Sequence, residues 1–192
     1  MQAIREKDFD TFATLTMKDS DNLHAVCLDT YPPCVYMNDT SHAVCALIHK
    51  INEVCGDRDI EGIGCHKTIA CYTFDAGPNA CIFLREEHVP LVSGLIEHFF
   101  PPPTGSVVKL SESTGEGGIG NEDTYIRGEK VSPMRIASGK NFFLRKKFQG
   151  KIPVMPGALK YIIHTKIGNG PCTLSEDDAH LLNKETGNPD FL

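Results

Sequence analysis

The stretch TIACYTFDAGPNACIFL, residues 68–84, decides the fold that this sequence predicts. Its first part, residues 68–74, is rich in β-branched and aromatic side chains, which favour a strand. Residues 75–79 contain Asp, Gly, Pro and Asn, which favour a turn, and residues 80–84 form a second apolar run. Two short strands joined by a five-residue turn predict an antiparallel hairpin.

Helical patterns flank this hairpin on both sides. Apolar residues at helical spacing predict amphipathic helices over residues 3–18 and from Thr40–Ser41 to Gly56, with a polar loop over 56–66. A further helix follows the hairpin and ends at Pro101–Pro103, because proline lacks a backbone donor. Residues 160–166 predict a last strand. The helix after the hairpin is expected to bury Val89, Val92, Leu95, Ile96 and Phe99. The pattern indicates an α+β domain.

Residues 101–141 differ in composition from the rest of the chain. They are rich in Gly, Ser, Thr, Glu and Pro, which predicts a long flexible insertion. Within them, residues 115–120 match G-x-G-x-x-G, the pattern of a dinucleotide-binding turn. That turn requires a strand before it and a helix after it, and neither is predicted here. Glu116 and Glu122 also place negative charge where a phosphate would bind, so we interpret the match as an acidic loop.

Composition narrows the class of protein. The 192 residues suit one ordinary domain or two small ones, and 41% are hydrophobic, enough for a sizeable core. Twenty-five acidic against 19 basic residues give a formal charge of −6, which argues against nucleic-acid binding. No apolar run approaches the roughly 18–20 residues that span a bilayer. The charged start, residues 1–8, shows no secretory signal, so we expect a cytoplasmic protein without membrane contact.

The cysteines indicate buried free thiols rather than disulfides. They are spread over predicted helices and strands, without an export signal. A zinc site needs clustered pairs of ligands. Cys65, His66 and Cys71 come nearest to such a cluster, but a second pair is missing, so the sequence predicts no metal site. A metal-dependent enzyme that uses these three residues is the least favoured alternative. The eight cysteines are Cys27, Cys34, Cys45, Cys55, Cys65, Cys71, Cys81 and Cys172.

Local chemistry gives the segment 72–80 a structural interpretation first. Asp75 can close an Asx-turn, Gly77 can adopt a positive φ, and Pro78 fixes its own φ. A catalytic interpretation of Asp75 needs further support, and four blocks of sequence give it. In chain order they are KDFDTFATLTMKDSDNLHAVCLDTYPP (7–33), VYMNDTS (35–41), CYTFDAGPNA (71–80) and KYIIHTKIGNGP (160–171).

These blocks resemble the C-terminal half of mevalonate diphosphate decarboxylases, over nearly the whole chain apart from 101–141. The resemblance implies that Asp75 is the catalytic carboxylate of an ATP- and Mg²⁺-dependent reaction. In that reaction the tertiary 3-hydroxyl of mevalonate diphosphate is phosphorylated. Phosphate and carbon dioxide then leave, which yields isopentenyl diphosphate for isoprenoid and sterol biosynthesis. The family usually forms homodimers. It usually has asparagine where Asp21 stands, so we assign no role to that position.

The resemblance also implies a fold, the ferredoxin-like C-terminal domain of the GHMP kinase superfamily, with the order β-α-β-β-α-β. The first strand of that order is absent from our interpretation, and so are the N-terminal ATP-binding domain and its Gly/Ser-rich loop. We therefore expect the isolated chain to be inactive, and either unstable or paired with another chain. A truncated gene model, a fragment and one part of a split enzyme are all compatible with this. The alternative is a non-catalytic dimerisation or interaction module derived from that domain.

Overall fold

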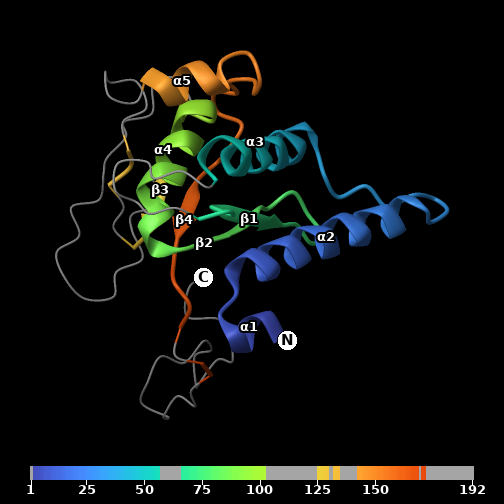
Figure 1. Cartoon of the computed structure of the whole chain (residues 1–192). Coiled ribbons are helices and arrows are strands. Elements are labelled where there is room, and N and C mark those ends of the chain that lie inside the picture. The colour runs from blue at the N-terminus through green and yellow to red at the C-terminus, as the bar shows by residue number, and fades with distance from the viewer. Residues whose placement is uncertain are drawn as a thin grey trace, which may run out of the picture.

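The computed structural model describes a mixed α+β chain (Figure 1). The described residues are 2–56, 66–102, 125–129, 132–134, 142–168 and 170–171. The elements are α1 (Gln2–Glu6), α2 (Phe9–Leu28), α3 (Asp39–Cys55), β1 (Ala70–Thr73), β2 (Cys81–Leu84), η1 (Glu86–His88), α4 (Val89–Phe99), β3 (Ile126–Gly128), α5 (Phe142–Phe148) and β4 (Ile162–His164). The predicted α+β class is confirmed.

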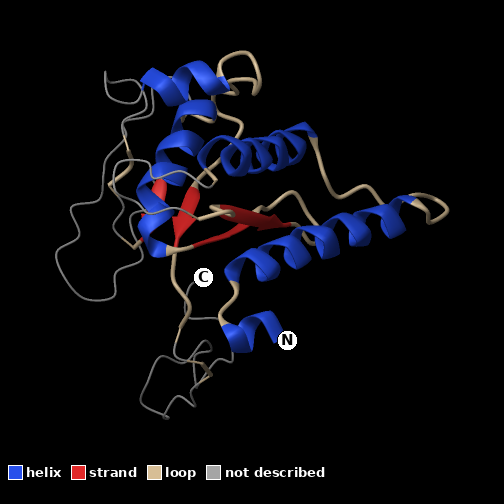
Figure 2. Cartoon of the chain, in the orientation of Figure 1, coloured by secondary structure: helices blue, strands red, loops and turns tan. Residues whose placement is uncertain are grey.

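The hairpin lies between two long helices (Figure 2). Both α2 and α3 contact β1. The strands pair antiparallel, with Ala70 opposite Leu84 and Thr73 opposite Cys81, so the predicted hairpin is confirmed. Residues before β1 and after β2 therefore meet at one end of the hairpin, and the turn forms the other end.

The outer edge of β1 is bonded by side chains instead of a strand. The side-chain amide of Asn52, on α3, donates to the carbonyl of Ala70 at 2.8 Å, and its oxygen accepts from the N–H groups of Ile69 and Ala70. Asp10, on α2, accepts from the N–H of Thr68 at 2.8 Å. Because buried backbone groups need partners, these bonds fix the hairpin to both helices.

The predicted helix over residues 3–18 is wrong in its extent. The chain forms the short α1, turns at Lys7, whose φ is +54°, and begins α2 after Asp8. Asp8 is the N-cap, because its carboxylate accepts from the N–H and the hydroxyl of Thr11. α2 then continues past residue 18, the predicted end, to Leu28.

The other two predicted helices are confirmed as α3 and α4. α3 begins one residue earlier than predicted, because Asn38 and Ser41 form a reciprocal capping box. Of the predicted face of α4, Val92, Leu95 and Phe99 are buried, whereas Val89 and Ile96 are half-buried. The largest fully buried core side chains are Leu47, Ile48, Ile51, Ile69, Phe74, Leu91, Leu95, Phe100, Leu144 and Phe148.

The predicted last strand is confirmed as β4, and it has a partner that the sequence did not indicate. β3 lies within residues 101–141 and pairs parallel with β4. Tyr125, just before β3, is buried and donates its hydroxyl to the carbonyl of Phe100. Gly128 has φ +87°, and a Cβ there would lie 2.1 Å from the carbonyl oxygen of His164. Most of residues 101–141, for which a flexible insertion is predicted, and all of the G-x-G-x-x-G match at 115–120 lie outside the described residues.

The six described cysteines form no disulfide with one another, as predicted, but the predicted burial holds for only two of them. Cys55 and Cys71 are buried, Cys27 and Cys45 are half-buried, and Cys34 and Cys81 are exposed. Within the part of the chain that the structure describes, none of the helices has the length and apolar character to cross a bilayer.

Candidate active site

Asp75 lies at the start of the turn between β1 and β2, with its side chain exposed. One carboxylate oxygen, Oδ1, accepts a hydrogen bond from the N–H of Ala76 at 2.7 Å. The main-chain carbonyl of Asp75 accepts from the N–H of Gly77, also at 2.7 Å. The turn therefore orients the carboxylate through one oxygen and leaves the group accessible to solvent and to a bound molecule.

The turn differs from the predicted Asx-turn. In an Asx-turn the side chain of Asp75 bonds the N–H two residues on, but here the main-chain carbonyl takes that bond. The predicted positive φ at Gly77 is also wrong, because the described positive-φ glycines lie elsewhere. A Cβ at Gly77 would meet nothing within 4 Å, so neither conformation nor packing requires glycine there.

Ser20, on α2, anchors the residue that precedes Asp75. Its hydroxyl oxygen accepts from the N–H of Phe74 at 3.0 Å, and the hydroxyl lies 3.4 Å from the carbonyl oxygen of the same residue, to which it donates. Ser20 is 3% exposed and Phe74 is 1% exposed. These buried bonds place the backbone at Asp75 on the α2 side of the hairpin.

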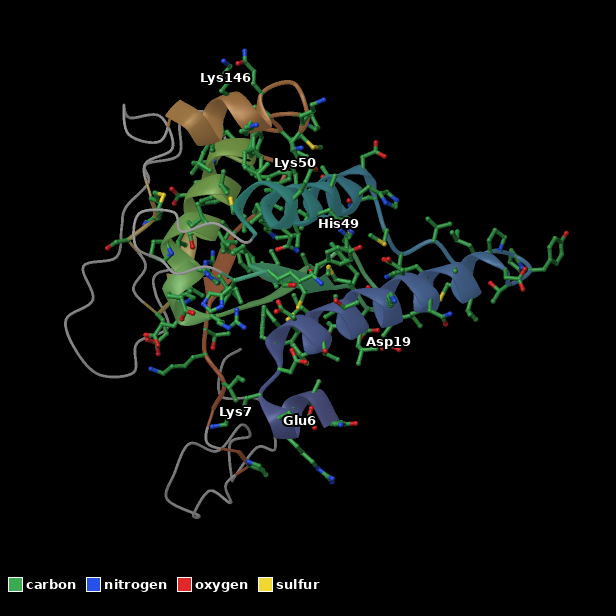
Figure 3. The ribbon with its side chains drawn as sticks, in the orientation of Figure 1. Glu6, Lys7, Asp19, His49, Lys50 and Lys146 are labelled. Carbon is green, nitrogen blue, oxygen red and sulfur yellow. The ribbon has the colours of Figure 1, made fainter. Side chains whose placement is uncertain are left out.

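A second polar cluster joins α2, β1 and α3. The hydroxyl of Tyr72, on β1, donates to Asp21 Oδ1 of α2 at 3.1 Å. It also lies 3.1 Å from His49 Nε2 of α3, the side chain that Figure 3 shows on the hairpin side of its helix. Burial is the main cause that raises the pKa of Tyr72 well above its usual range, with Cys45 and Asp21 adding to it. Tyr72 therefore keeps its proton and acts as a hydrogen-bond donor.

Sequence reasoning predicted Asp75 but missed Ser20 and Tyr72. A usable signal was present for Ser20, because Ala13, Ser20 and His24 lie on one buried face of α2 at helical spacing. A serine on such a face must find a buried partner. No comparable signal marks Tyr72, whose partners come from segments far apart in the sequence.

The N-termini of α2, α3 and α4 are not suited to bind phosphate. Helices bind phosphate through free N–H groups in their first turn. In α2 the carboxylate of Asp8 accepts one of these bonds, and in α3 the side chain of Asn38 does so. α4 follows directly on Glu86 and Glu87, whose charge opposes an anion. The N-termini of α2, α3 and α4 therefore do not suit the phosphates of ATP.

The cysteine–histidine set considered for a metal is not brought together within the described residues. Cys65 lies outside them. His66 groups with Glu87 and His88 instead of with Cys71.

One family of enzymes matches this sequence over most of its length. The family model described as the mevalonate 5-diphosphate decarboxylase C-terminal domain matches residues 1–174, so the chain belongs to that family. The resemblance found in the sequence is thereby confirmed.

The matched relatives are diphosphomevalonate decarboxylases. The chain is 35% identical to the one from Danio rerio over 182 residues, 95% of this chain and 38% of the relative. It is 39% identical to the Homo sapiens protein over 181 residues, 94% of this chain and 37% of the relative. The chain therefore spans somewhat more than a third of the length of these relatives.

Two solved structures are also similar. A crystal structure of mevalonate 5-diphosphate decarboxylase is 44% identical, covers 53% of this chain and 24% of its own, and has a TM-score of 0.42. Mevalonate diphosphate decarboxylase from Trypanosoma brucei is 34% identical, covers 55% of this chain and 25% of its own, and has a TM-score of 0.43.

Proposed function

We propose that this chain is the C-terminal part of an ATP-dependent decarboxylase that converts mevalonate 5-diphosphate to isopentenyl diphosphate in isoprenoid biosynthesis. The single observation that carries the proposal is Asp75, an exposed carboxylate on a turn whose preceding residue is fixed by Ser20. Membership of the decarboxylase family supports the substrate, which is also the substrate implied by the names of the relatives.

Asp75 suits the difficult step of this chemistry. A tertiary hydroxyl is crowded and weakly nucleophilic, so a positioned carboxylate that accepts its proton helps it to react. Phosphoryl transfer depends mainly on positioning and charge, and the anchored turn supplies the positioning. Because Asp75 is exposed, it can release that proton to solvent, and its restored negative charge then favours positive character at the tertiary carbon when phosphate leaves.

Nucleotide and Mg²⁺ belong to another part of the proposed enzyme. The N-termini of α2 and α3 are capped by the chain itself, and α4 is preceded by acidic residues. ATP is therefore expected to bind to that other part, and we expect the chain alone to show no turnover.

We also propose a ferredoxin-like arrangement that lacks its first strand. In that order the second strand lies at an edge of the sheet, and β1 has the outer edge bonded by Asn52 and Asp10 that suits such a position. The missing strand would lie beside β2, between β2 and β4. In the described part of the chain the strand neighbour of β2 is β1 alone. An unpaired edge of this kind accepts a strand from another segment.

The alternative, a dimerisation or interaction module, rests on exposed apolar side chains of α2. Leu15, Val26 and Leu28 are each more than half exposed, and exposed apolar side chains that form a contiguous patch mark interaction sites. A homodimer is compatible with either proposal. Sedimentation of the chain distinguishes them when combined with activity, because the module forms a stable dimer that gains no turnover from an added N-terminal half.

The experiment joins this chain to the N-terminal part of the human relative and measures phosphate release with ATP and mevalonate 5-diphosphate. We expect release from the joined protein and none from the 192-residue chain alone. A joined protein that folds and binds both substrates without releasing phosphate would contradict the decarboxylase proposal. Release by the chain alone would contradict the assignment of ATP to another part.

A further inference from the structure

Potential metal ligands meet at the base of the hairpin, at the opposite end from Asp75. His66 precedes β1, and Glu87 and His88 lie in η1, just after β2. Because the strands pair antiparallel, these two segments are brought side by side. One ligand atom from each of the three residues lies within 4.8 Å of the other two.

The distances suit a small tetrahedral ion. His66 Nε2 lies 3.2 Å from Glu87 Oε1. Bonds of about 2.0–2.1 Å to a tetrahedral zinc ion place neighbouring ligand atoms roughly 3.3–3.4 Å apart. The rings of His66 and His88 lie edge to face, with centroids 5.1 Å apart, so a modest side-chain adjustment completes the set.

The burial of His88 without hydrogen-bond partners points to a ligand. Its side chain is fully buried, and within the described residues neither ring nitrogen has a hydrogen-bond partner. The carbonyl of Ile69 is near enough to affect the pKa of His88, but it does not complete a hydrogen bond of normal geometry. An unpartnered buried polar group is costly, and a metal ion that takes a ring lone pair satisfies one nitrogen.

The charges around His88 are of both signs. Glu87 contributes a negative charge at the site itself. Arg85 contributes a positive one, but its guanidinium lies over the ring of Phe9, 4.7 Å from the centroid. The side chains of His66 and Glu87 are 33% and 43% exposed, which leaves a route for the ion and room for a water ligand.

We propose that His66, Glu87 and His88 bind a divalent transition-metal ion of the zinc type. Two imidazole nitrogens and one carboxylate oxygen are a ligand set that zinc uses with a water in the fourth position. Mg²⁺ is not expected, because it prefers oxygen ligands throughout. The bound ion would fasten the segment before β1 to the start of α4, independently of the reaction proposed for Asp75.

The test is a Zn²⁺ titration of the 192-residue chain against a competing coloured chelator. Two substitutions at ligands that are not fully buried, His66→Ala and Glu87→Gln, are each expected to weaken zinc binding at least about tenfold. The matched controls are His42→Ala and Glu86→Gln, which change an exposed histidine and the acidic neighbour of Glu87. They should bind zinc as the unaltered chain does. Equal zinc affinity in all five proteins would overturn the proposal.

Cobalt separates this site from binding at the cysteines. Thiolate ligands to Co²⁺ give a charge-transfer band that imidazole and carboxylate ligands do not. We expect the unaltered chain with one equivalent of Co²⁺ to show the visible ligand-field band of four-coordinate Co²⁺ without the thiolate band, and His66→Ala to lose that visible band. Retention of the visible band in His66→Ala would overturn the proposal.

Discussion

The hydroxyl of Ser20 pairs with both backbone groups of Phe74, although 54 residues separate the two in the chain. Phe74 fills the core, and the next residue is Asp75, with its carboxylate exposed. One buried serine thus links the interior of the domain to its candidate catalytic group. The placement of Asp75 depends on α2 as well as on the turn.

Ser20→Ala tests this link. The substitution leaves the N–H and carbonyl of Phe74 without their side-chain partner, so we expect a loss of about 1–3 kcal/mol in the free energy of unfolding, measured with urea. Thr14→Ala, an exposed hydroxyl on the same helix, is the control and should change stability by less than about 0.5 kcal/mol. Equal stability of the two variants would show that the Ser20 bonds contribute nothing.

Asn52→Ala tests the outer edge of β1. It removes the partner of the Ile69 and Ala70 N–H groups and of the Ala70 carbonyl. Each group left unpaired costs about 1–3 kcal/mol, so we expect a larger loss than for Ser20→Ala and faster hydrogen exchange at Ala70. The neighbouring Glu53→Ala removes only an exposed ion pair and serves as the control. Unchanged exchange at Ala70 would count against the bonded edge.

The raised pKa values of two thiols predict how the free energy of unfolding changes at alkaline pH. Burial raises the pKa of Cys71, and also that of Cys45, from 9.0 to about 11. The folded chain therefore holds these protons more tightly than the unfolded chain. The stabilisation is intact below pH 9.0 and is lost as the pH rises to about 11.

Urea unfolding across this pH range gives the measurement. Cys71→Ala should flatten part of the decline in the free energy of unfolding, whereas Cys34→Ala, which removes an exposed thiol, should leave the decline unchanged. If the two variants show the same pH profile, burial of Cys71 does not control its proton.

The elements that local pattern determines could be predicted from the sequence. The hairpin followed from two apolar runs around a turn, and α3 and α4 from helical spacing. The break at Lys7 was missed because the apolar pattern runs continuously across it. The break depends instead on Asp8, whose side chain caps the start of α2. β3 was missed because three residues in a polar stretch carry too little pattern, and parallel pairing with β4 stabilises them.

The candidate site, too, could be predicted from the sequence only in part. Asp75 was found because a resemblance singled it out, since its local chemistry indicated only a turn. Ser20, Tyr72 and the group around His88 bring together residues from separate elements. Such contacts arise from tertiary packing, and spacing along one segment does not encode them. The predicted absence of a metal site considered only ligands close in sequence.

The claim that Asp75 is the catalytic carboxylate is tested most directly by Asp75→Asn in the joined protein. The control is Asp19→Asn, which changes an exposed aspartate on α2. The amide oxygen of asparagine can still accept from the N–H of Ala76, so the fold and the KM for mevalonate 5-diphosphate should be preserved. We expect kcat for phosphate release to fall by about 10²–10⁴-fold, the usual contribution of a positioned general base. A kcat close to that of Asp19→Asn would contradict the account and leave Asp75 as a turn residue only.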